Sequence, residues 1–286
     1  MEINEDKFME LAYLNGWIGS LEDASVSVND RGYNFGDGVY EVIRAYNGVM
    51  FAPEEHLKRL ELSAAAVEIA LPRGLTELKD ITEDVLIKSG IREVMIYIQV
   101  TRGTAPRNHL CEADLQPNLL ITVRNIPEIP PALYSEGVKV ITVPEFRWQM
   151  CNIKSISLQA SVLAKHKAQR AGAAEAVFVM PDGTVTEGAS SNIFIFKNGV
   201  LMTHPADNRI LAGVTRHFVL KVAESLGVKV RVEPFNISEL MTAEEVFITG
   251  TVVEIVPVIN ADGKIIGNGK PGPVTARLHK GFASLR

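Results

Sequence analysis

One lysine, Lys154, stands in apolar company in the sequence, between Ile153 and Ile156. Burial disfavours the charged form of a lysine, and a neutral amine is a nucleophile that can form a Schiff base. A lysine can also lay its alkyl chain along apolar surface while its ammonium reaches water. This stretch taken alone favours the second interpretation, so the other motifs of the chain must decide between the two.

A second stretch, residues 186–192, places a carboxylate before small hydroxyl residues. Glu187 is followed by Ser190 and Ser191, and an apolar run begins at Ile193. A polar turn between two strands would explain these residues without any chemistry. The functional interpretation is a carboxylate that holds a proton on a ring nitrogen.

Several residues could bind a phosphate group. Residues 213–215, Gly-Val-Thr, lie near the start of a predicted helix, and a helix N-terminus offers free N–H groups to phosphate. Plain N-capping explains the same residues equally well. Thr251 ends a Thr-Gly-Thr stretch and could add hydroxyl and amide donors. Arg59, late in the first long helix, is either a solvated arginine or a phosphate ligand.

Two further stretches could bind a carboxylate-bearing substrate. Arg107 and His109 belong to a polar loop, and such side chains bind carboxylates through charge-assisted hydrogen bonds. An exposed basic turn is the alternative. Tyr40 follows a glycine-rich turn and could direct its hydroxyl into a pocket. The alternative for Tyr40 is a core aromatic beside a tight turn.

Some standard sites are missing from the sequence. There is no Walker A loop and no His-Glu-x-x-His pair, and the six histidines are not spaced as metal ligands, so no metal site is predicted. Residues 267–272 match the Gly-x-Gly-x-x-Gly dinucleotide fingerprint, but they include Pro271 and no βαβ unit follows. We therefore predict a loop there.

The elements that must position these residues are helices and mainly antiparallel strands. Asn-Gly pairs predict hairpins over residues 11–19, 39–51 and 193–203, because Asn-Gly readily takes the positive φ angles of a type I′ turn. Apolar periodicity and helix stop signals predict helices over residues 53–70, 76–89, 158–171 and 211–226, and a short helix at the C-terminus. Further strands are predicted over residues 91–101, 119–124, 138–143, 176–180, 245–249 and 256–259. The mixture predicts an α+β fold.

Residues 126–131 form the best linker in the chain, because their three prolines favour a stiff extended crossing. We predict a smaller α+β domain over residues 1–125 that contains the Arg107 loop. The larger predicted domain, residues 132–286, contains Lys154 and the phosphate-binding residues.

Composition limits the class of protein. The chain has 286 residues, enough for two domains, and 47% hydrophobic with 22% charged residues is typical of a soluble globular protein. A net charge of −5 gives no support for a nucleic-acid or anionic-membrane partner, and no apolar run could span a bilayer. Cys111 and Cys151 form no disulfide framework, which predicts a reducing cytoplasm. Residues 1–9 are acidic and lack the apolar core of a signal peptide.

Taken together, these stretches resemble the class IV (fold type IV) pyridoxal-phosphate aminotransferases. The resemblance covers nearly the whole chain, and its seven motifs occur in the same order. They are residues 30–41, 56–60, 100–109, 152–155, 186–192, 213–216 and 249–251. The resemblance implies a two-domain fold type IV architecture, pyridoxal 5′-phosphate as cofactor and ping-pong transamination.

The resemblance also implies a role for each candidate residue. Lys154 would be the Schiff-base lysine and the general base, and Glu187 would face the pyridine nitrogen. Asn192 would lie near the phenolic edge of the cofactor, and Leu211 would pack against its ring. The cofactor phosphate would be bound by Arg59, Val214, Thr215 and Thr251.

The expected substrate depends on the polar loop that contains Arg107 and His109, here called the carboxylate loop. By the resemblance Arg107 and His109, with Tyr40, would bind the substrate α-carboxylate, and in the family this loop reaches in from a partner subunit, which implies a homodimer. The Arg-x-His pair resembles the D-specific members, so the expected substrates are a D-amino acid of the D-alanine or D-glutamate type and a 2-oxo acid. Val252 and Val253 are closer to the pattern of the branched-chain L-amino acid aminotransferases, which are the alternative.

Aminodeoxychorismate lyase and a non-catalytic binding protein are rival candidates from different classes of function. The lyase shares the fold but eliminates pyruvate, and Arg107 with His109 argues against it. A non-catalytic phosphate- or metabolite-binding protein would need neither Lys154 nor Glu187.

Overall fold

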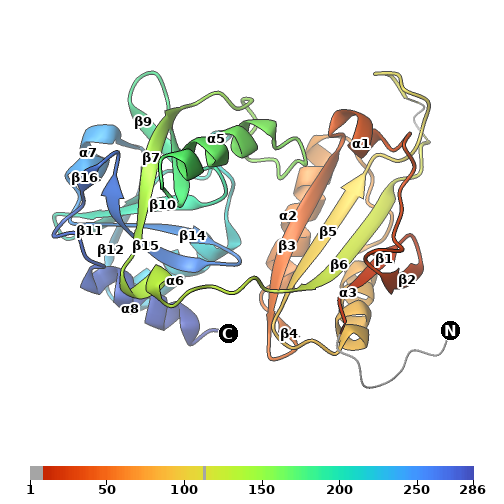
Figure 1. The fold of residues 1–286 in the computed structure, drawn as a ribbon, viewed down its shortest axis with the longest axis horizontal. Helices are drawn as coiled ribbons and strands as arrows, with labels where there is room; N and C mark the ends of the chain where they lie inside the picture. The colour runs from red at the N-terminus through yellow and green to blue at the C-terminus, as the bar shows by residue number, and fades with distance from the viewer. Residues whose placement is uncertain (1–8, 112–113) are drawn as a thin grey trace. The chain divides into compact units, whose positions relative to one another are not determined.

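The computed structural model describes residues 9–111 and 114–286. Residues 1–8, on which most of the N-terminal signal-peptide prediction rests, and residues 112–113 of the predicted polar loop lie outside the described residues. The chain forms two compact units (Figure 1). Unit 1 takes in the chain up to Pro127 together with Ile153–Ser157, and unit 2 takes in Glu128–Asn152 and Leu158–Arg286. The lysine segment, which the sequence analysis assigned to residues 132–286, therefore belongs to unit 1.

Unit 1 is built on an antiparallel sheet of six strands in the order β2-β1-β6-β5-β3-β4. The strands are β1 (Leu11–Leu14), β2 (Trp17–Ser20), β3 (Gly38–Tyr46), β4 (Val49–Met50), β5 (Val94–Thr101) and β6 (Asn118–Asn125). Alternate residues of β5 are buried, as expected for a strand with one face on a core. That face contributes Ile96 and Ile98, which share a core with Leu57, Leu60 and Leu78 of the two long helices.

The helices of unit 1 are α1 (Arg31–Phe35), α2 (Pro53–Ala66) and α3 (Leu75–Ser89). The predicted helix over residues 53–70 ends early, because Glu68 adopts a φ of 55° that an α-helix does not contain. Helix α1 forms where the sequence predicted only a turn. The Asp30 side chain accepts hydrogen bonds from the N–H groups of Gly32 and Tyr33, and Gly36, at φ 67°, ends the helix.

All three predicted Asn-Gly hairpins are confirmed. Asn15, Asn47 and Asn198 have φ angles of 49°, 52° and 51°, and the glycine after each also has a positive φ. This left-handed geometry is the one that a type I′ turn requires. The turns connect β1 to β2, β3 to β4, and β10 to β11.

Unit 2 contains a sheet of ten strands in the order β12-β11-β10-β14-β15-β7-β8-β9-β13, with β16 paired to β15. The strands are β7 (Val138–Pro144), β8 (Glu175–Val179), β9 (Thr184–Gly188), β10 (Asn192–Lys197), β11 (Val200–Thr203), β12 (Lys229–Val232), β13 (Phe235–Asn236), β14 (Glu245–Gly250), β15 (Glu254–Ala261) and β16 (Lys264–Ile265). Three neighbouring pairs, β11/β12, β15/β7 and β7/β8, run parallel, and the other pairs run antiparallel. The predicted α+β class with mainly antiparallel sheets is confirmed.

The helices of unit 2 are α4 (Ala132–Ser135), α5 (Gln159–Arg170), α6 (Val214–Ser225), α7 (Ile237–Met241) and α8 (Pro273–Ala283). Helix α5 packs on β7 and β8, and α6 packs on α8 and β14 (Figure 1). None of the helices in the described ranges is long and apolar enough to cross a membrane.

Two elements near the candidate residues differ from the prediction. The helix predicted from residue 211 begins at Val214, because Gly213 is an extended N-cap at φ −63° and ψ 133°. Leu211 therefore lies in the loop before the helix. Glu187, for which a polar turn was the alternative interpretation, lies in strand β9, where it follows the β-branched residues Val185 and Thr186. Residues 267–272 form a loop, as predicted.

Candidate active site

The Lys154 segment runs along the start of β3 within unit 1. The Lys154 carbonyl accepts a hydrogen bond from the Tyr40 N–H at 2.9 Å, and the Gly38 carbonyl accepts one from the Ile156 N–H at 3.1 Å. Lys154 also donates its N–H to Ser63 Oγ of α2 at 3.1 Å. Because its backbone is bonded on both sides, the position of Lys154 is set by β3 and α2.

The side chain of Lys154 lies over an aromatic ring. Its Nζ is 4.3 Å from the centroid of the Tyr40 ring, and that ring stacks on Tyr97 at 5.5 Å. Ile153, directly before the lysine, is only 5% exposed and belongs to the core of unit 1. Lys154 itself is half-buried. A cation–π contact of this kind orients the ammonium over the ring. The structure therefore brings the predicted residues Lys154 and Tyr40 together.

Glu41, next to Tyr40 in β3, is fully buried and binds two basic side chains. Arg59 donates from Nε to Oε1 at 2.6 Å and from Nη2 to Oε2 at 2.8 Å, and His56 Nδ1 lies 2.8 Å from Oε2. Burial raises the pKa of Glu41, but the Arg59 charge and the bonds from His56 and Arg59 outweigh it and lower that pKa to about 2. Since an ionised carboxylate only accepts hydrogen bonds, His56 Nδ1 carries a proton.

Arg59 was predicted to bind phosphate, and in the structure its guanidinium is oriented by Glu41. Burial lowers the pKa of His56, in spite of the bond to Glu41. The His56 imidazole is therefore neutral near neutral pH. The ion pair of this cluster is the one between Arg59 and Glu41.

The carboxylate loop lies against helix α1 within unit 1. Arg107 and His109 are exposed, with the Arg107 guanidinium 5.1 Å and the His109 ring 5.5 Å from the ring of Phe35. Buried Arg31 donates from Nη1 to the Asn108 carbonyl at 2.6 Å and from Nη2 to the His109 carbonyl at 3.0 Å. Arg31 therefore holds the loop that bears the predicted substrate-binding side chains.

In unit 2, Glu187, Asn192 and Leu211 form one hydrogen-bonded cluster. Glu187 Oε2 accepts from Asn192 Nδ2 at 3.0 Å and from the Leu211 N–H at 3.0 Å. Asn192 Nδ2 also donates to the Leu211 carbonyl at 2.9 Å. Glu187 Oε1 accepts from Arg147 Nη1 at 2.6 Å. Three donors, one of them charged, favour the ionised form of the buried Glu187 carboxyl.

The predicted phosphate-binding residues of unit 2 follow Gly213 and Thr249, two backbone positions that lie beside Asn192. No side chain caps the N-terminus of α6, where Val214 and Thr215 form the first turn. A Cβ at Gly213 would lie 2.0 Å from Asn192 Oδ1, so only glycine lets the helix start this close to Asn192. Asn192 is the register partner of Thr249, which precedes the turn containing Thr251.

The loop after Glu187 is anchored by a buried carboxylate that the sequence analysis missed. Glu175 Oε2 accepts from Ser190 N at 3.2 Å, Ser190 Oγ at 2.7 Å and Ser191 Oγ at 3.0 Å. Glu175 is 2% exposed. Since Ser190 and Ser191 lie between Glu187 and Asn192, this anchor helps to fix both ends of the cluster.

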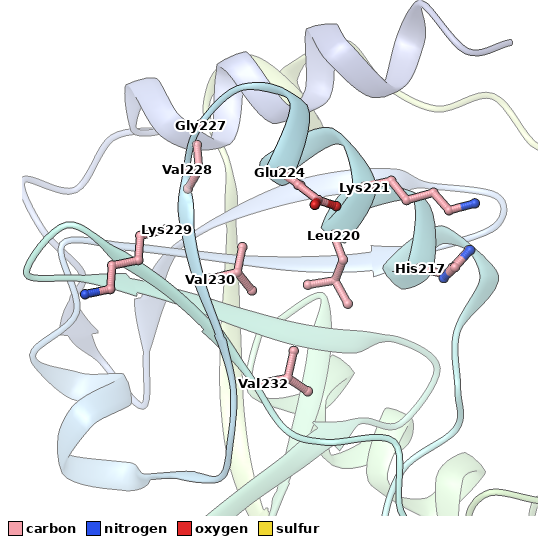
Figure 2. A pocket seen from close by; sticks show the side chains of 9 residues that line it. All are labelled: His217, Leu220, Lys221, Glu224, Gly227, Val228, Lys229, Val230 and Val232. Carbon is pink, nitrogen blue, oxygen red and sulfur yellow. The ribbon is translucent and has the colours of Figure 1, made fainter.

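A groove of about 570 Å³ lies elsewhere on unit 2, along the outer side of α6 and β12 (Figure 2). Apolar side chains, among them Leu220, Val230 and Val232, line the space between helix and strand, and Lys221 and Lys229 lie at its rim. The predicted site residues are not among those that line it. Within the described ranges no group of histidine, cysteine and acidic side chains could hold a metal ion.

Comparison with known proteins assigns the chain to a family. The family model described as Amino-transferase class IV matches residues 38–261. The D-alanine aminotransferase of Listeria monocytogenes serotype 4b (strain F2365) is 43% identical over 272 residues, which are 94% of this chain and 93% of the relative. The D-alanine aminotransferase of Bacillus licheniformis is 44% identical over 265 residues, covering 92% and 93% of the two chains.

Solved structures agree with the fold. The branched-chain amino acid aminotransferase of Escherichia coli superposes with a TM-score of 0.90 at 28% identity, covering 96% of this chain and 93% of that one. A second branched-chain amino acid aminotransferase, solved with pyridoxamine 5′-phosphate, superposes with a TM-score of 0.89, also at 28% identity and with the same coverage of both chains. The branched-chain aminotransferase of the thermophilic archaeon Thermoproteus uzoniensis, with norvaline, gives a TM-score of 0.86 at 29% identity, again over 96% and 93% of the two chains.

Proposed function

The chain belongs to the class IV aminotransferases, and from this we propose that it transfers the amino group of a D-amino acid of the D-alanine type to a 2-oxo acid. The protein is a pyridoxal-phosphate-dependent transferase of fold type IV. The observation that carries the substrate is the similarity to D-alanine aminotransferases, at 43% and 44% identity over more than nine-tenths of this chain.

The residues present fit pyridoxal phosphate. The cofactor needs an amine for its aldehyde, a carboxylate for its ring nitrogen and donors for its phosphate. Lys154 offers the amine beside Tyr40, and Glu187 is a buried, hydrogen-bonded carboxylate. Thr249 Oγ1 is buried and, among the residues described, has no hydrogen-bond partner, which supports a polar ligand near the end of β14, just before the turn that contains Thr251.

We assign the cofactor contacts as proposals. Lys154 Nζ would hold the cofactor covalently, Glu187 would keep a proton on the ring nitrogen, and Asn192 would lie near the phenolic edge. Leu211 would pack on the ring. The residues that would bind the phosphate are Arg59, Val214, Thr215 and Thr251.

When bound, pyridoxal phosphate supplies an aldehyde that forms covalent links to amines and a ring that accepts electrons. The chain supplies the proton movement and the orientation. Lys154 Nζ, once exchanged for the substrate amine, is the group proposed to take the proton from the substrate Cα. Its backbone bonds to Tyr40 and Ser63 support this role, because a general base must be held at a fixed place.

Enantiomer choice is proposed to depend on the carboxylate loop. Arg107 and His109, with Tyr40, would bind the substrate α-carboxylate and so determine which face of Cα meets Lys154. The position of this loop supports the role. The side chains of Arg107 and His109 are exposed beside Phe35, and Arg31 donates a hydrogen bond to the His109 carbonyl, which anchors the loop backbone. We also propose a homodimer in which this loop serves the partner subunit. The free thiols of Cys111 and Cys151 support a cytoplasmic location.

The alternative is a branched-chain L-amino acid aminotransferase. Two observations favour it: the superposition on branched-chain enzymes at TM-scores of 0.90 and 0.89, and the apolar side chains of Val252 and Val253 after Thr251. The higher sequence identity to D-alanine aminotransferases, over nearly the whole chain, makes the D-specific reaction the main proposal.

Paired half-reactions test the proposal. The purified protein loaded with pyridoxal phosphate is mixed with D-alanine or with L-leucine, and the loss of the cofactor absorbance band is followed. Fast conversion with D-alanine supports the proposal, and fast conversion with L-leucine alone overturns it. Lys154→Ala, which should convert neither amino acid, is the control for uncatalysed exchange.

A further inference from the structure

Arg147 is a nearly buried arginine between two carboxylates of unit 2. Its side chain is 10% exposed, and those of Glu145 and Glu187 are 12% and 6% exposed. Nη1 donates to Glu187 Oε1 at 2.6 Å, while Nη2 donates to Glu145 Oε2 at 2.7 Å and Nε donates to Glu145 Oε1 at 3.0 Å. The bidentate pair with Glu145 is the fork geometry that arginine and a carboxylate prefer.

The rest of the contacts around Arg147 fix its orientation. The guanidinium carbon lies 4.2 Å from the centroid of the buried Phe178 ring, and Nη2 also donates to the Arg209 carbonyl at 3.3 Å. Glu145 on one side and Phe178 on the face leave Nη1 directed at Glu187. A lysine could not replace this geometry, because its ammonium is a point charge without a planar fork.

The carboxylates around Arg147 keep its guanidinium protonated. Burial lowers the pKa of Arg147. The hydrogen bond to Glu145 and the charges of Glu187 and Glu145 together outweigh this effect, so the pKa of Arg147 lies above its ordinary value. The guanidinium is therefore cationic at every working pH. Glu187 and Glu145 share this cation, and the charge of Arg216 also acts on Glu187.

Resting on the proposed function, we propose that Arg147, held by Glu145, is a positioning residue that sets how strongly Glu187 binds the protonated ring nitrogen of pyridoxal phosphate. Arg147 directs Glu187 Oε1, and the Asn192 and Leu211 donors direct Oε2. Both oxygens of the carboxylate are therefore oriented by the protein before the cofactor arrives, which lowers the cost of ordering them on binding.

The test isolates the ring nitrogen by comparing two ligands of the cofactor-free full chain. One is pyridoxal phosphate, and the other is its analogue with carbon in place of the ring nitrogen. The ratio of the two dissociation constants measures what the nitrogen contact contributes. A hydrogen bond to a charged group corresponds to a ratio of about tenfold or more in the wild type.

The expected results form a double-mutant cycle. Glu187→Gln should bring the ratio close to one. Arg147→Met should lower it at least about fivefold relative to the wild type, and Arg147→Met in the Glu187→Gln protein should change it no further. A purely structural role for Arg147 would weaken both ligands equally and leave the ratio unchanged, which would overturn the proposal. A wild-type ratio near one would overturn it as well.

Two further variants keep the test decisive. Arg147→Lys retains the charge and should give an intermediate ratio. If neither Arg147 variant folds while Glu187→Gln does, a structural role is the better account and the proposal fails. Arg231→Met removes an arginine that pairs with Glu233 on the surface of unit 2, and it should leave the ratio at the wild-type value.

Different results would contradict the proposed function and the role of Arg147. A wild-type protein that binds no pyridoxal phosphate, or that transaminates neither D-alanine nor L-leucine, contradicts the proposed function. An Arg147→Met protein with an unchanged ratio, in a chain whose wild type transaminates, contradicts only the role given to Arg147.

Discussion

Arg59 donates two hydrogen bonds to the two oxygens of Glu41, at 2.6 and 2.8 Å, inside the core of unit 1. Glu41 has no exposed surface, and the side chain of Arg59 is 11% exposed. The guanidinium proposed to bind the cofactor phosphate is therefore oriented by a residue that lies outside the proposed cofactor contacts. Glu41 therefore contributes both to the stability of unit 1 and to the orientation of the Arg59 guanidinium.

Glu41→Gln should destabilise the cofactor-free protein. The substitution leaves Arg59 and His56 without their charged acceptor, and breaking a buried pair of this kind costs about 3 to 5 kcal/mol. The measurement is urea denaturation of wild type and variant near neutral pH. Glu61→Gln is the control, since Glu61 pairs with Lys58 at the surface and its loss should cost less than about 1 kcal/mol.

The stability difference between Glu41→Gln and the wild type should also depend on pH. The pKa of Glu41 is depressed in the folded protein, from an ordinary value of 4.5 to about 2. Its contribution is therefore fully present above pH 4.5 and is lost as the pH falls from there towards 2. The advantage of the wild type should shrink over this range. A difference that stays constant down to the acid limit would contradict the assignment of an ionised Glu41.

Arg31→Met should weaken substrate binding while leaving cofactor binding unchanged. The variant loses the bonds to the carbonyls of Asn108 and His109, so the loop that bears Arg107 is no longer anchored. Asp37, the other partner of Arg31, keeps its bond from Arg102, which protects the fold. The expected result is a KM for D-alanine raised about tenfold or more, with a similar dissociation constant for pyridoxal phosphate.

Arg124→Met is the matched control for Arg31→Met, because Arg124 is an exposed arginine of β6 in the same unit. Its KM should equal that of the wild type. A fall in kcat at unchanged KM in the Arg31 variant would mean that Arg31 does not act through the loop.

The sequence predicted the local features well, since each depends on neighbours along the chain. Asn-Gly turns specify their own backbone angles, and the stop of α3 follows from Gly90 at φ 66°. The seven motifs also contain Lys154, Glu187 and Arg107, whose roles in the site stay predictions. Arg31 lies within the first of these motifs, and yet its partners are the carbonyls of Asn108 and His109, far along the chain, so no local pattern could assign its role.

The partners of Glu187 and the start of α6 were beyond local reasoning for a similar reason. Arg147 lies 40 residues before Glu187, and only the pairing of β7, β8 and β9 brings them together. Leu211 and Ala212 fit the apolar pattern of the helix, but the extended backbone at Gly213 and the bond from the Leu211 N–H to Glu187 keep them outside it. Tertiary hydrogen bonding here overrides the periodicity.

Cys151 should react slowly with alkylating reagents in the folded protein. Burial raises the pKa of its thiol to about 11, and the thiolate is the reactive form. The thiol also donates a hydrogen bond to the Trp148 carbonyl at 3.1 Å. In a Cys111→Ser variant, where Cys151 is the only cysteine, the alkylation rate should rise about tenfold per pH unit up to about pH 10. A rate that levels off near pH 9, as in the urea-unfolded chain, would contradict this environment.

Gly213→Ala should weaken pyridoxal phosphate binding by about tenfold or more, because the added methyl would lie 2.0 Å from Asn192 Oδ1 and displace the side chain that bonds Glu187. Gly74→Ala is a closely matched control. Gly74 is the N-cap of α3 at φ −65° and ψ 157°, also without a side-chain cap, and nothing lies within 4 Å of the position that an added methyl would take. Both variants change helix propensity equally, since each replaces an extended N-cap glycine. Equal affinity for the cofactor in the two variants would show that Asn192 does not depend on the space left by Gly213, and a loss confined to Gly213→Ala would tie the start of α6 to the Glu187 cluster.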